Sequence, residues 1–181
     1  EKHDWLVEEA KIKLKNPELA FGINLVSSTL AFDLKTAYEK KKDILSPNLA
    51  KLIEIGLSQK AIDFVNGLSM RKTMYERLFK FFQDYDLLIT PTTGVPAFEH
   101  GIMYPEKIGG KPASPLTWMS FTYPFNMTGL PAASIPCGWS SEGLPIGMQI
   151  VGRKYDDLTV LQASKAFEDI APWQDRKPKL D

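Results

Sequence analysis

Cysteine and histidine are scarce in this 181-residue sequence. Cys137 is the single cysteine, which excludes an internal disulfide. His3 lies in the charged N-terminal segment and His100 in a later loop, and neither is near Cys137 in the sequence. Two isolated histidines and one distant cysteine do not provide the ligands of a metal site. We therefore expect no metal, and no motif in the sequence calls for a cofactor.

An excess of charge is also missing, because 22 basic residues balance 22 acidic ones. Without a net positive field, we expect no nucleic-acid partner and no binding to an anionic membrane. No apolar run approaches the roughly 18 residues of a transmembrane helix, and no signal peptide opens the chain. The single cysteine agrees with a reducing compartment. Together these observations predict a cytoplasmic protein.

The common catalytic motifs are absent as well. The sequence contains no Gly-x-Ser-x-Gly elbow, no Gly-x-Gly-x-x-Gly and no Walker loop. Ser69-Met70-Arg71-Lys72 matches Ser-x-x-Lys, but its Ser-Asp-Asn and Lys-Thr-Gly partner motifs are missing, so we interpret Ser69 as a helix residue. Cys137 has no nearby histidine and is expected to be a small buried thiol. The residues alone therefore predict no catalytic machinery.

What the chain does contain is a stretch of glycine, proline and apolar residues from 126 to 152. It predicts two short strands, Ala132–Pro136 and Ile146–Val151, joined by the polar turn Trp139–Gly143. Glycine allows positive φ and proline lacks a backbone N–H donor, so glycines and prolines on both sides of two strands are compatible with the edge of a binding site. An ordinary core hairpin with tight turns explains it equally well.

The first half of the chain is predicted to be helical. A short, mostly exposed helix is expected over residues 1–16, and a second one from Pro17 to about Lys41 with Phe21, Leu25 and Phe32 on one face. A third helix follows Ser46, and Ser58 is the predicted N-cap of the longest helix, about 59–83. The helical period assigns that helix an inward face of Ile62, Val65, Leu68, Tyr75, Leu78, Phe79 and Phe82.

The second half alternates between strands and loops. Leu87–Thr90 is a predicted buried strand, residues 92–115 form a long loop, and Asp156-Asp157 begins a last helix that ends near Ile170. We divide the single domain 1–181 into a mainly helical part (1–85), strands and a long loop (86–152), and a final helix and tail (153–181). Three strands are too few for these helices. This mismatch, and a first residue that is Glu1 rather than Met, predict a piece of a larger domain.

The pattern of residues 125–152 resembles the C-terminal half of the amidase signature family. The resemblance rests on Phe125-Asn-Met-Thr-Gly-Leu-Pro-Ala-Ala-Ser-Ile-Pro-Cys-Gly138 and Gly143-Leu-Pro-Ile-Gly-Met-Gln-Ile-Val-Gly152. Upstream, Gly56-Leu57-Ser58 and Tyr85-Asp-Leu-Leu-Ile-Thr-Pro-Thr92 match in order and spacing, and so does Trp173-Gln174 near the end. The similarity covers residues 43–181.

The resemblance implies an α/β fold, namely the C-terminal part of the amidase signature fold, with a mixed sheet and helices packed around it. It also implies hydrolysis of amide C–N bonds by a Ser–Ser–Lys triad, with backbone N–H groups stabilising the oxyanion. The triad belongs to the family's N-terminal half. No position here matches it, Ser69 and Ser134 included, so we assign no catalytic residue and expect the chain alone to be inactive.

In the family, this half provides strands and the walls of the substrate pocket. On that basis the predicted substrate-binding residues are Trp118, Met119, Phe121, Phe125 and Asn126. In the tRNA-dependent members an acidic residue in this region binds the substrate ammonium, but no Asp or Glu occurs between Lys111 and Glu142. This departure favours a small apolar or aromatic amide. Packing of the same aromatic residues in a core remains the alternative.

The missing N-terminal half is the first expected partner of the chain. Sheet edges and apolar faces that lack their cover promote self-association, so a homo-oligomer is also expected. The alternative to part of an enzyme is a non-catalytic binding or scaffolding module derived from the same fold.

Overall fold

A computed structural model describes residues 5–15, 17–24 and 30–177 of the chain. Its elements, in order, are α1 Pro17–Asn24, α2 Ala31–Lys41, η2 Lys42–Ile44, α3 Pro47–Ser58, α4 Ala61–Phe81, β1 Leu87–Pro91, β2 Lys107–Ile108, β3 Lys111–Pro112, η3 Thr117–Met119, α5 Tyr123–Thr128, β4 Ala132–Trp139, β5 Pro145–Gly152 and α6 Asp157–Ile170. Over these described ranges, no helix combines the length and the apolar character needed to cross a membrane.

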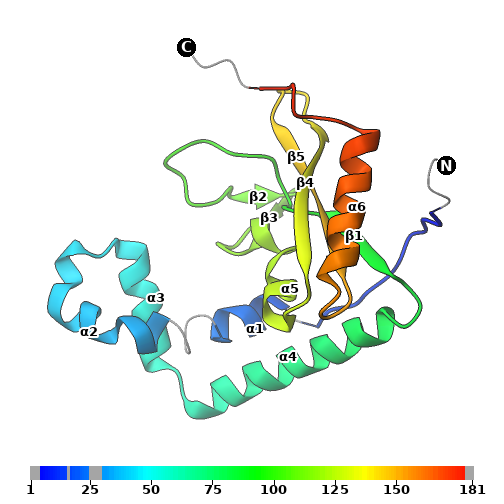
Figure 1. The fold of residues 1–181 in the computed structure, drawn as a ribbon. Helices are drawn as coiled ribbons and strands as arrows, with labels where there is room; N and C mark the ends of the chain where they lie inside the picture. Colours follow the sequence, from blue (N-terminus) through cyan, green and yellow to red (C-terminus); the bar gives the residue numbers. More distant parts are fainter. Residues whose placement is uncertain (1–4, 16, 25–29, 178–181) are drawn as a thin grey trace.

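A three-stranded sheet with the order β1-β5-β4 forms the centre of the molecule (Figure 1). Both pairings are antiparallel, with Ile89 opposite Ile150 and Ile150 opposite Ala133. Side chains from α1, α4, α5 and β5 form the larger core cluster on one side of the sheet. On the other side, Val160 and Ala163 of α6 pack against Ile150. The α/β class and the helices packed around a sheet are thereby confirmed.

The β4–β5 hairpin agrees with the sequence prediction. Its turn is closed by a hydrogen bond from Ser140 N to Leu144 O (2.8 Å), and Gly143 adopts φ = 81°. The ladder shifts register between Pro136 and Gly138, which is a β-bulge that leaves one extra residue on β4. That residue is Cys137, whose side chain is exposed. The prediction of a buried thiol was wrong, because the bulge turns this position out of the alternating pattern of the strand.

The longest helix, α4, begins two residues later than its predicted start. Ser58 is the last residue of α3, where its hydroxyl donates to Ile55 O (2.8 Å), so Ser58 does not cap α4. The N-terminus of α4 is satisfied instead by Asp63 Oδ2, which accepts a hydrogen bond from Lys60 N (3.0 Å). Ser58 was predicted because it is the nearest residue before the apolar period whose side chain commonly caps helices. The acidic side chain in the first turn made that cap unnecessary.

The predicted inward face of α4 was only partly correct. Leu78 and the following Phe82 are buried, but four of the predicted residues are exposed, and we call these the outer stripe: Ile62, Val65, Leu68 and Phe79. The buried stripe contains Gly67, Met74 and Leu78 instead. At about 100° per residue, the two stripes lie on roughly opposite sides of the helix. Apolar periodicity therefore identified a helix with two apolar sides but not the side that is covered.

The N-terminal segment is extended, so the predicted helix was wrong over residues 5–15, while residues 1–4 and 16 lie outside the described part. The segment is held in place by tertiary contacts. The Arg77 guanidinium donates to Lys13 O, and the Tyr85 hydroxyl donates to Glu8 Oε1 (2.6 Å). Ile12 and Leu14 pack against the larger core cluster. These contacts across the chain override the weak local preference for helix.

The helix predicted from Pro17 to Lys41 corresponds to α1 and α2, and both of its predicted ends agree with the structure. The middle of the prediction, including Leu25, lies outside the described residues. Phe32 is exposed, so its predicted place on a buried face was wrong. α2 packs against α3, and this helix pair stands to one side of the sheet (Figure 1). The third helix, α3, begins after Ser46 as predicted, and Ser46 caps it by accepting a hydrogen bond from Leu49 N (3.3 Å).

The long loop after β1 contains a small β2–β3 hairpin that the sequence prediction did not include. Gly109 and Gly110 form its two-residue turn, with φ = 57° and 75°. Positive φ at both positions is typical of a type I′ turn. The last helix, α6, is capped by Asp156, whose carboxylate accepts from Thr159 N (3.3 Å), and it ends at Ile170 as predicted.

Candidate functional site

A row of polar side chains crosses the sheet on the face opposite α6. Thr90 of β1, Gln149 of β5 and Ser134 of β4 are directly opposite one another in the strand register. Side chains two residues apart share one face of a strand, so Thr92 continues this row just beyond β1. We call Thr90, Thr92, Ser134 and Gln149 the polar row. It combines three hydroxyl groups and one amide and carries no formal charge.

Two hydroxyl groups of the polar row meet above a glycine. Thr92 Oγ1 lies 2.7 Å from Ser134 Oγ, and Thr92 N donates to Gly147 O (2.9 Å). A Cβ at Gly147 would lie 2.8 Å from Thr92 Oγ1 and 3.0 Å from Ser134 Oγ. A Cβ contact of 2.8 Å would force Thr92 to shift, so glycine is the residue that lets the two hydroxyls approach across β5.

Gln149 connects the sheet to the segment before α5 that contains Trp118 and Phe121, which we call the aromatic segment. Its side chain is 4% exposed, and its Nε2 donates to Thr90 Oγ1 (2.9 Å) and to Phe121 O (2.8 Å). A buried amide that is left without partners costs about 1–3 kcal/mol, so both hydrogen bonds help to fix this arrangement. The backbone at Phe121 is thereby held next to the polar row.

A second connection holds the aromatic segment at Trp118. Gly94 N, two residues after Thr92, donates to Trp118 O (2.8 Å). The Trp118 ring packs edge-on against Phe98 of the long loop, with centroids 5.8 Å apart and an interplanar angle of 80°. Phe121 is 37% exposed and Trp118 is half-buried. Exposed aromatic surface and neutral hydrogen-bonding groups therefore lie in neighbouring parts of the structure.

The five predicted substrate-binding residues do not occupy one environment. Trp118 and Phe121 belong to the segment that is bonded to the polar row, and Met119 packs against the larger core cluster. Phe125 is 4% exposed and lies inside that cluster, while Asn126 is exposed on α5. No ligand tests these assignments, which stay predictions. Of the five, Trp118 and Phe121 have the positions best suited to contact a ligand.

Tyr123 is a buried neighbour of this region. Its ring stacks on Phe21 with centroids 4.9 Å apart, and burial, assisted by the negative charge of Glu18, raises the pKa of its phenol to about 12. Glu18 also accepts a hydrogen bond from Ser114 Oγ (2.5 Å), which links α1 to the long loop. Tyr123 is therefore a neutral core residue at physiological pH and is not poised for proton transfer.

The residues that the sequence raised as nucleophiles or ligands remain scattered. Ser69 is exposed on α4, and Lys72 pairs with Glu76 (3.6 Å) rather than with Ser69. His100 is exposed in the long loop, and His3 lies outside the described residues. Within the ranges that the structure describes, no three His, Cys, Asp or Glu side chains gather as a metal site would require. The polar row contains no acid–base pair, so its chemistry is hydrogen bonding.

Sequence reasoning missed the polar row itself. Gly147 inside the second predicted strand, and the polar residues Ser134 and Gln149 within the two apolar runs, were visible in the sequence. Their association depends on the register of β4 and β5 and on the pairing of β1 with β5. The pairing of β1 with β5 joins residues far apart in the chain, and no local pattern specifies it.

The comparisons with known proteins agree with one another on the family. A family model described as Amidase matches residues 7–161. A glutamyl-tRNA(Gln) amidotransferase subunit from Oceanobacillus iheyensis is 40% identical over 104 residues, which cover 56% of this chain and 20% of the relative. The corresponding protein of Moorella thermoacetica is 41% identical over 117 residues, covering 65% of this chain and 23% of the relative.

Solved structures extend the likeness to nearly the whole fold. A crystal structure of an amidase superposes with a TM-score of 0.84 at 21% identity, covering 91% of this chain and 37% of that one. A bacterial aryl acylamidase of the amidase signature enzymes gives a TM-score of 0.77 at 27% identity, covering 92% of this chain and 37% of that one. The match thus spans about a fifth of the sequence relatives and somewhat over a third of the structural ones.

Proposed function

The chain belongs to the amidase family, and on that premise we propose that it is the C-terminal portion of an enzyme that hydrolyses amide C–N bonds. In this proposal the chain contributes sheet strands and pocket walls, while the serine nucleophile and its base come from the remainder of the domain. The observation that carries it is the asymmetric coverage, in which almost all of this chain matches just over a third of an amidase structure. The absence of any match to the Ser–Ser–Lys triad in the sequence supports the same conclusion.

The exposed apolar surface supports a missing neighbour. The outer stripe of α4 lies roughly opposite its buried stripe, and a helix with two apolar sides is typical of one packed between two layers. Leu158 and Leu161 of α6 are about two-thirds exposed. In the described part of the chain, β1 and β4 each pair on one side only. We propose that the N-terminal portion of the domain covers this surface and that the chain forms homo-oligomers without it.

For the substrate we propose a small apolar or aromatic amide. The exposed faces of Trp118 and Phe121 provide apolar contact, and the hydroxyls of Thr92 and Ser134 can donate to or accept from an amide group. The segment between Lys111 and Glu142 offers no carboxylate to hold a substrate ammonium. The likeness to an aryl acylamidase fits this substrate class. The relatives named for glutamyl-tRNA(Gln) suggest the competing class, a glutamine-type amide.

The test measures hydrolysis of an anilide and of glutamine by the chain alone and by the chain combined with a triad-containing N-terminal portion of an amidase. We expect no turnover by the chain alone, and anilide hydrolysis by the combination that is lost when the triad serine is replaced with alanine. Ser69→Ala and Lys72→Ala should have no effect. Turnover by the chain alone that disappears in these two variants would contradict the proposal.

The same experiment addresses the non-catalytic alternative. A binding or scaffolding module would form the complex yet turn over neither substrate. For the oligomer, sedimentation velocity of the isolated chain should show a dimer or larger species. A monodisperse monomer at micromolar concentration would show that the exposed apolar surface does not drive self-association, which would contradict this part of the proposal.

A further inference from the structure

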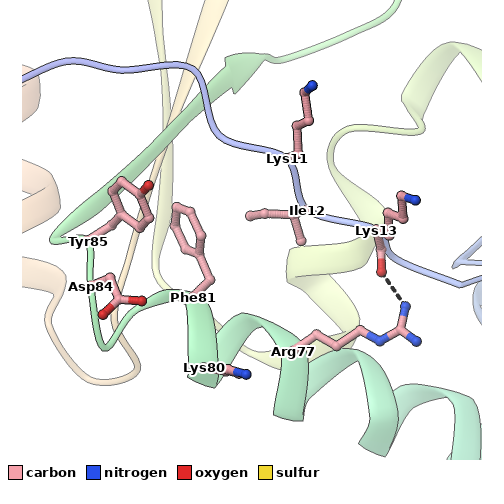
Figure 2. Close-up of a pocket in the computed structure, with 8 residues that line it drawn as sticks. All are labelled: Lys11, Ile12, Lys13, Arg77, Lys80, Phe81, Asp84 and Tyr85. Carbon is pink, nitrogen blue, oxygen red and sulfur yellow. Dashed lines mark hydrogen bonds between the residues drawn. The ribbon is translucent and has the colours of Figure 1, made fainter.

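An open groove of about 530 Å³ lies between the extended N-terminal segment and the C-terminal end of α4 (Figure 2). Its lining residues are Lys11, Ile12, Lys13, Arg77, Lys80, Phe81, Asp84 and Tyr85. The groove is next to the Leu87 end of β1, whereas Thr92 of the polar row follows the opposite end of that strand. The groove and the polar row are therefore two separate features.

The groove carries an excess of positive charge. Four of its eight residues are cationic (Lys11, Lys13, Arg77 and Lys80), and Asp84 is the single acidic one. In the described part of the chain, none of these four cationic side chains forms an ion pair with a carboxylate. The negative end of the α4 dipole favours cations at Arg77 and Lys80, but it does not account for the two lysines from the N-terminal segment.

One acidic group, Asp84, lines the groove, and a second, Glu8, lies beside it. Glu8 accepts a hydrogen bond from the Tyr85 hydroxyl (2.6 Å), which occupies one of its carboxylate oxygens. Asp84 follows α4 in the turn toward β1. Two acidic groups against four cations leave a positive local field, while the chain as a whole is neutral.

The floor of the groove is apolar and partly aromatic. The rings of Phe81 and Tyr85 stack with centroids 4.4 Å apart and an interplanar angle of 12°. Figure 2 shows the Ile12 side chain facing Phe81, with the Arg77 guanidinium beside the backbone of Lys13. Arg77 uses Nη1 to donate to Lys13 O. A guanidinium has five N–H donors, so several remain available to a planar anion.

We propose that this groove binds a small aromatic carboxylate. The ring of the ligand lies against Phe81 and Ile12, and its carboxylate is held by Arg77. The charges of Lys11, Lys13 and Lys80 add to the positive field around the groove. A planar carboxylate suits the guanidinium fork, and a flat ring suits the stacked aromatic floor. Such acids are also released when amides of aromatic carboxylic acids are hydrolysed. That link to a reaction product rests on the proposed function, whereas the binding itself does not.

The test is a titration of the isotope-labelled chain, followed by NMR, with benzoate, benzamide and acetate at low ionic strength. Benzoate should bind with a Kd of about 1–10 mM and shift the amide signals of residues 11–13 and 77–85. Benzamide, which lacks the charge, and acetate, which lacks the ring, should each bind at least about fivefold more weakly. Added salt should weaken benzoate binding, because the contacts are exposed ion pairs.

Two variants test the assigned residues. Arg77→Met should weaken benzoate binding about tenfold, which is the loss expected for one charge-assisted hydrogen-bonded pair. Because Arg77 also holds the N-terminal segment, Lys80→Met is the second variant, with an expected loss of about threefold. Lys72→Met is the control, since Lys72 lies on the same helix and outside the groove.

Three results would overturn the proposal. The first is equal binding of benzamide and benzoate, and the second is benzoate binding that neither groove variant changes. The third is a set of shifts centred on Thr92 and Trp118, which would place the carboxylate at the polar row. Failure of the anilide assay would leave all three measurements unaffected, so the two proposals can fail independently.

Discussion

Replacing Gly152 with alanine is expected to destabilise the fold, because α6 leaves no room for a side chain there. Gly152 ends β5 and is buried beneath the first turns of α6. A Cβ at this position would lie 2.6 Å from Val160 Cγ2 and 3.3 Å from Asp156 O. Val160 is 3% exposed, and a β-branched residue in a helix has one strongly preferred rotamer, so it cannot turn away. Overpacking of this kind costs about 1–3 kcal/mol of unfolding free energy.

A double-mutant cycle separates this clash from other effects. Val160→Ala alone removes the obstructing methyl group and should cost about 1–3 kcal/mol through lost burial and the cavity left behind. In Gly152→Ala combined with Val160→Ala, the new Cβ enters the vacated space. The double variant should therefore be less destabilised than the sum of the single variants, by about 1–2 kcal/mol.

The assay is urea unfolding of the four proteins, followed by tryptophan fluorescence and circular dichroism. Gly138→Ala is the matched control, because a Cβ at this position of β4 has no neighbour within 4 Å. Its effect should lie between none and about 1 kcal/mol of stabilisation. The reasoning is refuted if Gly152→Ala is as mild as Gly138→Ala, or if the two changes in the cycle are additive within about 0.5 kcal/mol.

Two further substitutions test the region around the polar row. Gln149→Leu removes both side-chain hydrogen bonds and leaves Phe121 O and Thr90 Oγ1 without this partner. It should therefore lower the unfolding free energy by about 1–3 kcal/mol. A decrease of less than about 0.5 kcal/mol in urea unfolding would show that these hydrogen bonds do not stabilise the fold. The folded-state pKa of Tyr123 is raised to about 12 from 10.0, so its contribution to stability should be constant below pH 10 and should be lost as the pH rises toward 12. Tyr123→Phe should lose this part of the alkaline decline. An unchanged decline in Tyr123→Phe would assign it to other groups.

The sequence was most informative where structure is local. The β4–β5 hairpin could be predicted because glycine and proline bound two apolar runs and the turn needs positive φ at Gly143. The start of α6 was equally predictable, since Asp156 precedes an apolar period and caps it directly. In both cases the residues that specify the element are neighbours in the chain. The local conformational preferences of these residues agree with the packing of the folded chain, and for this reason the two elements could be predicted.

The predictions were wrong where a distant segment decides the outcome. Residues 5–15 were predicted to form a helix, but Arg77 and Tyr85, more than sixty residues away, hold this segment extended. On α4 both apolar stripes are real, and only the packing of α1 and α5 selects the one that is buried. The polar row required the register of three strands, and the choice between a pocket and a core position for Phe125 required the placement of α5. These features depend on long-range pairing, which periodicity does not encode.

The position of the α2–α3 pair has a consequence for the cooperativity of unfolding. The two helices pack on each other, and a surface network of Tyr38, Lys42 and Glu54 joins them, with Lys42 Nζ 2.8 Å from Glu54 Oε1. Their buried residues are few and lie apart from the clusters at the sheet. This pair should therefore open as a unit of its own, and its amides should exchange hydrogen through a lower-energy opening than those of β5. Protease cleavage between Lys42 and Leu45 would then leave the sheet folded.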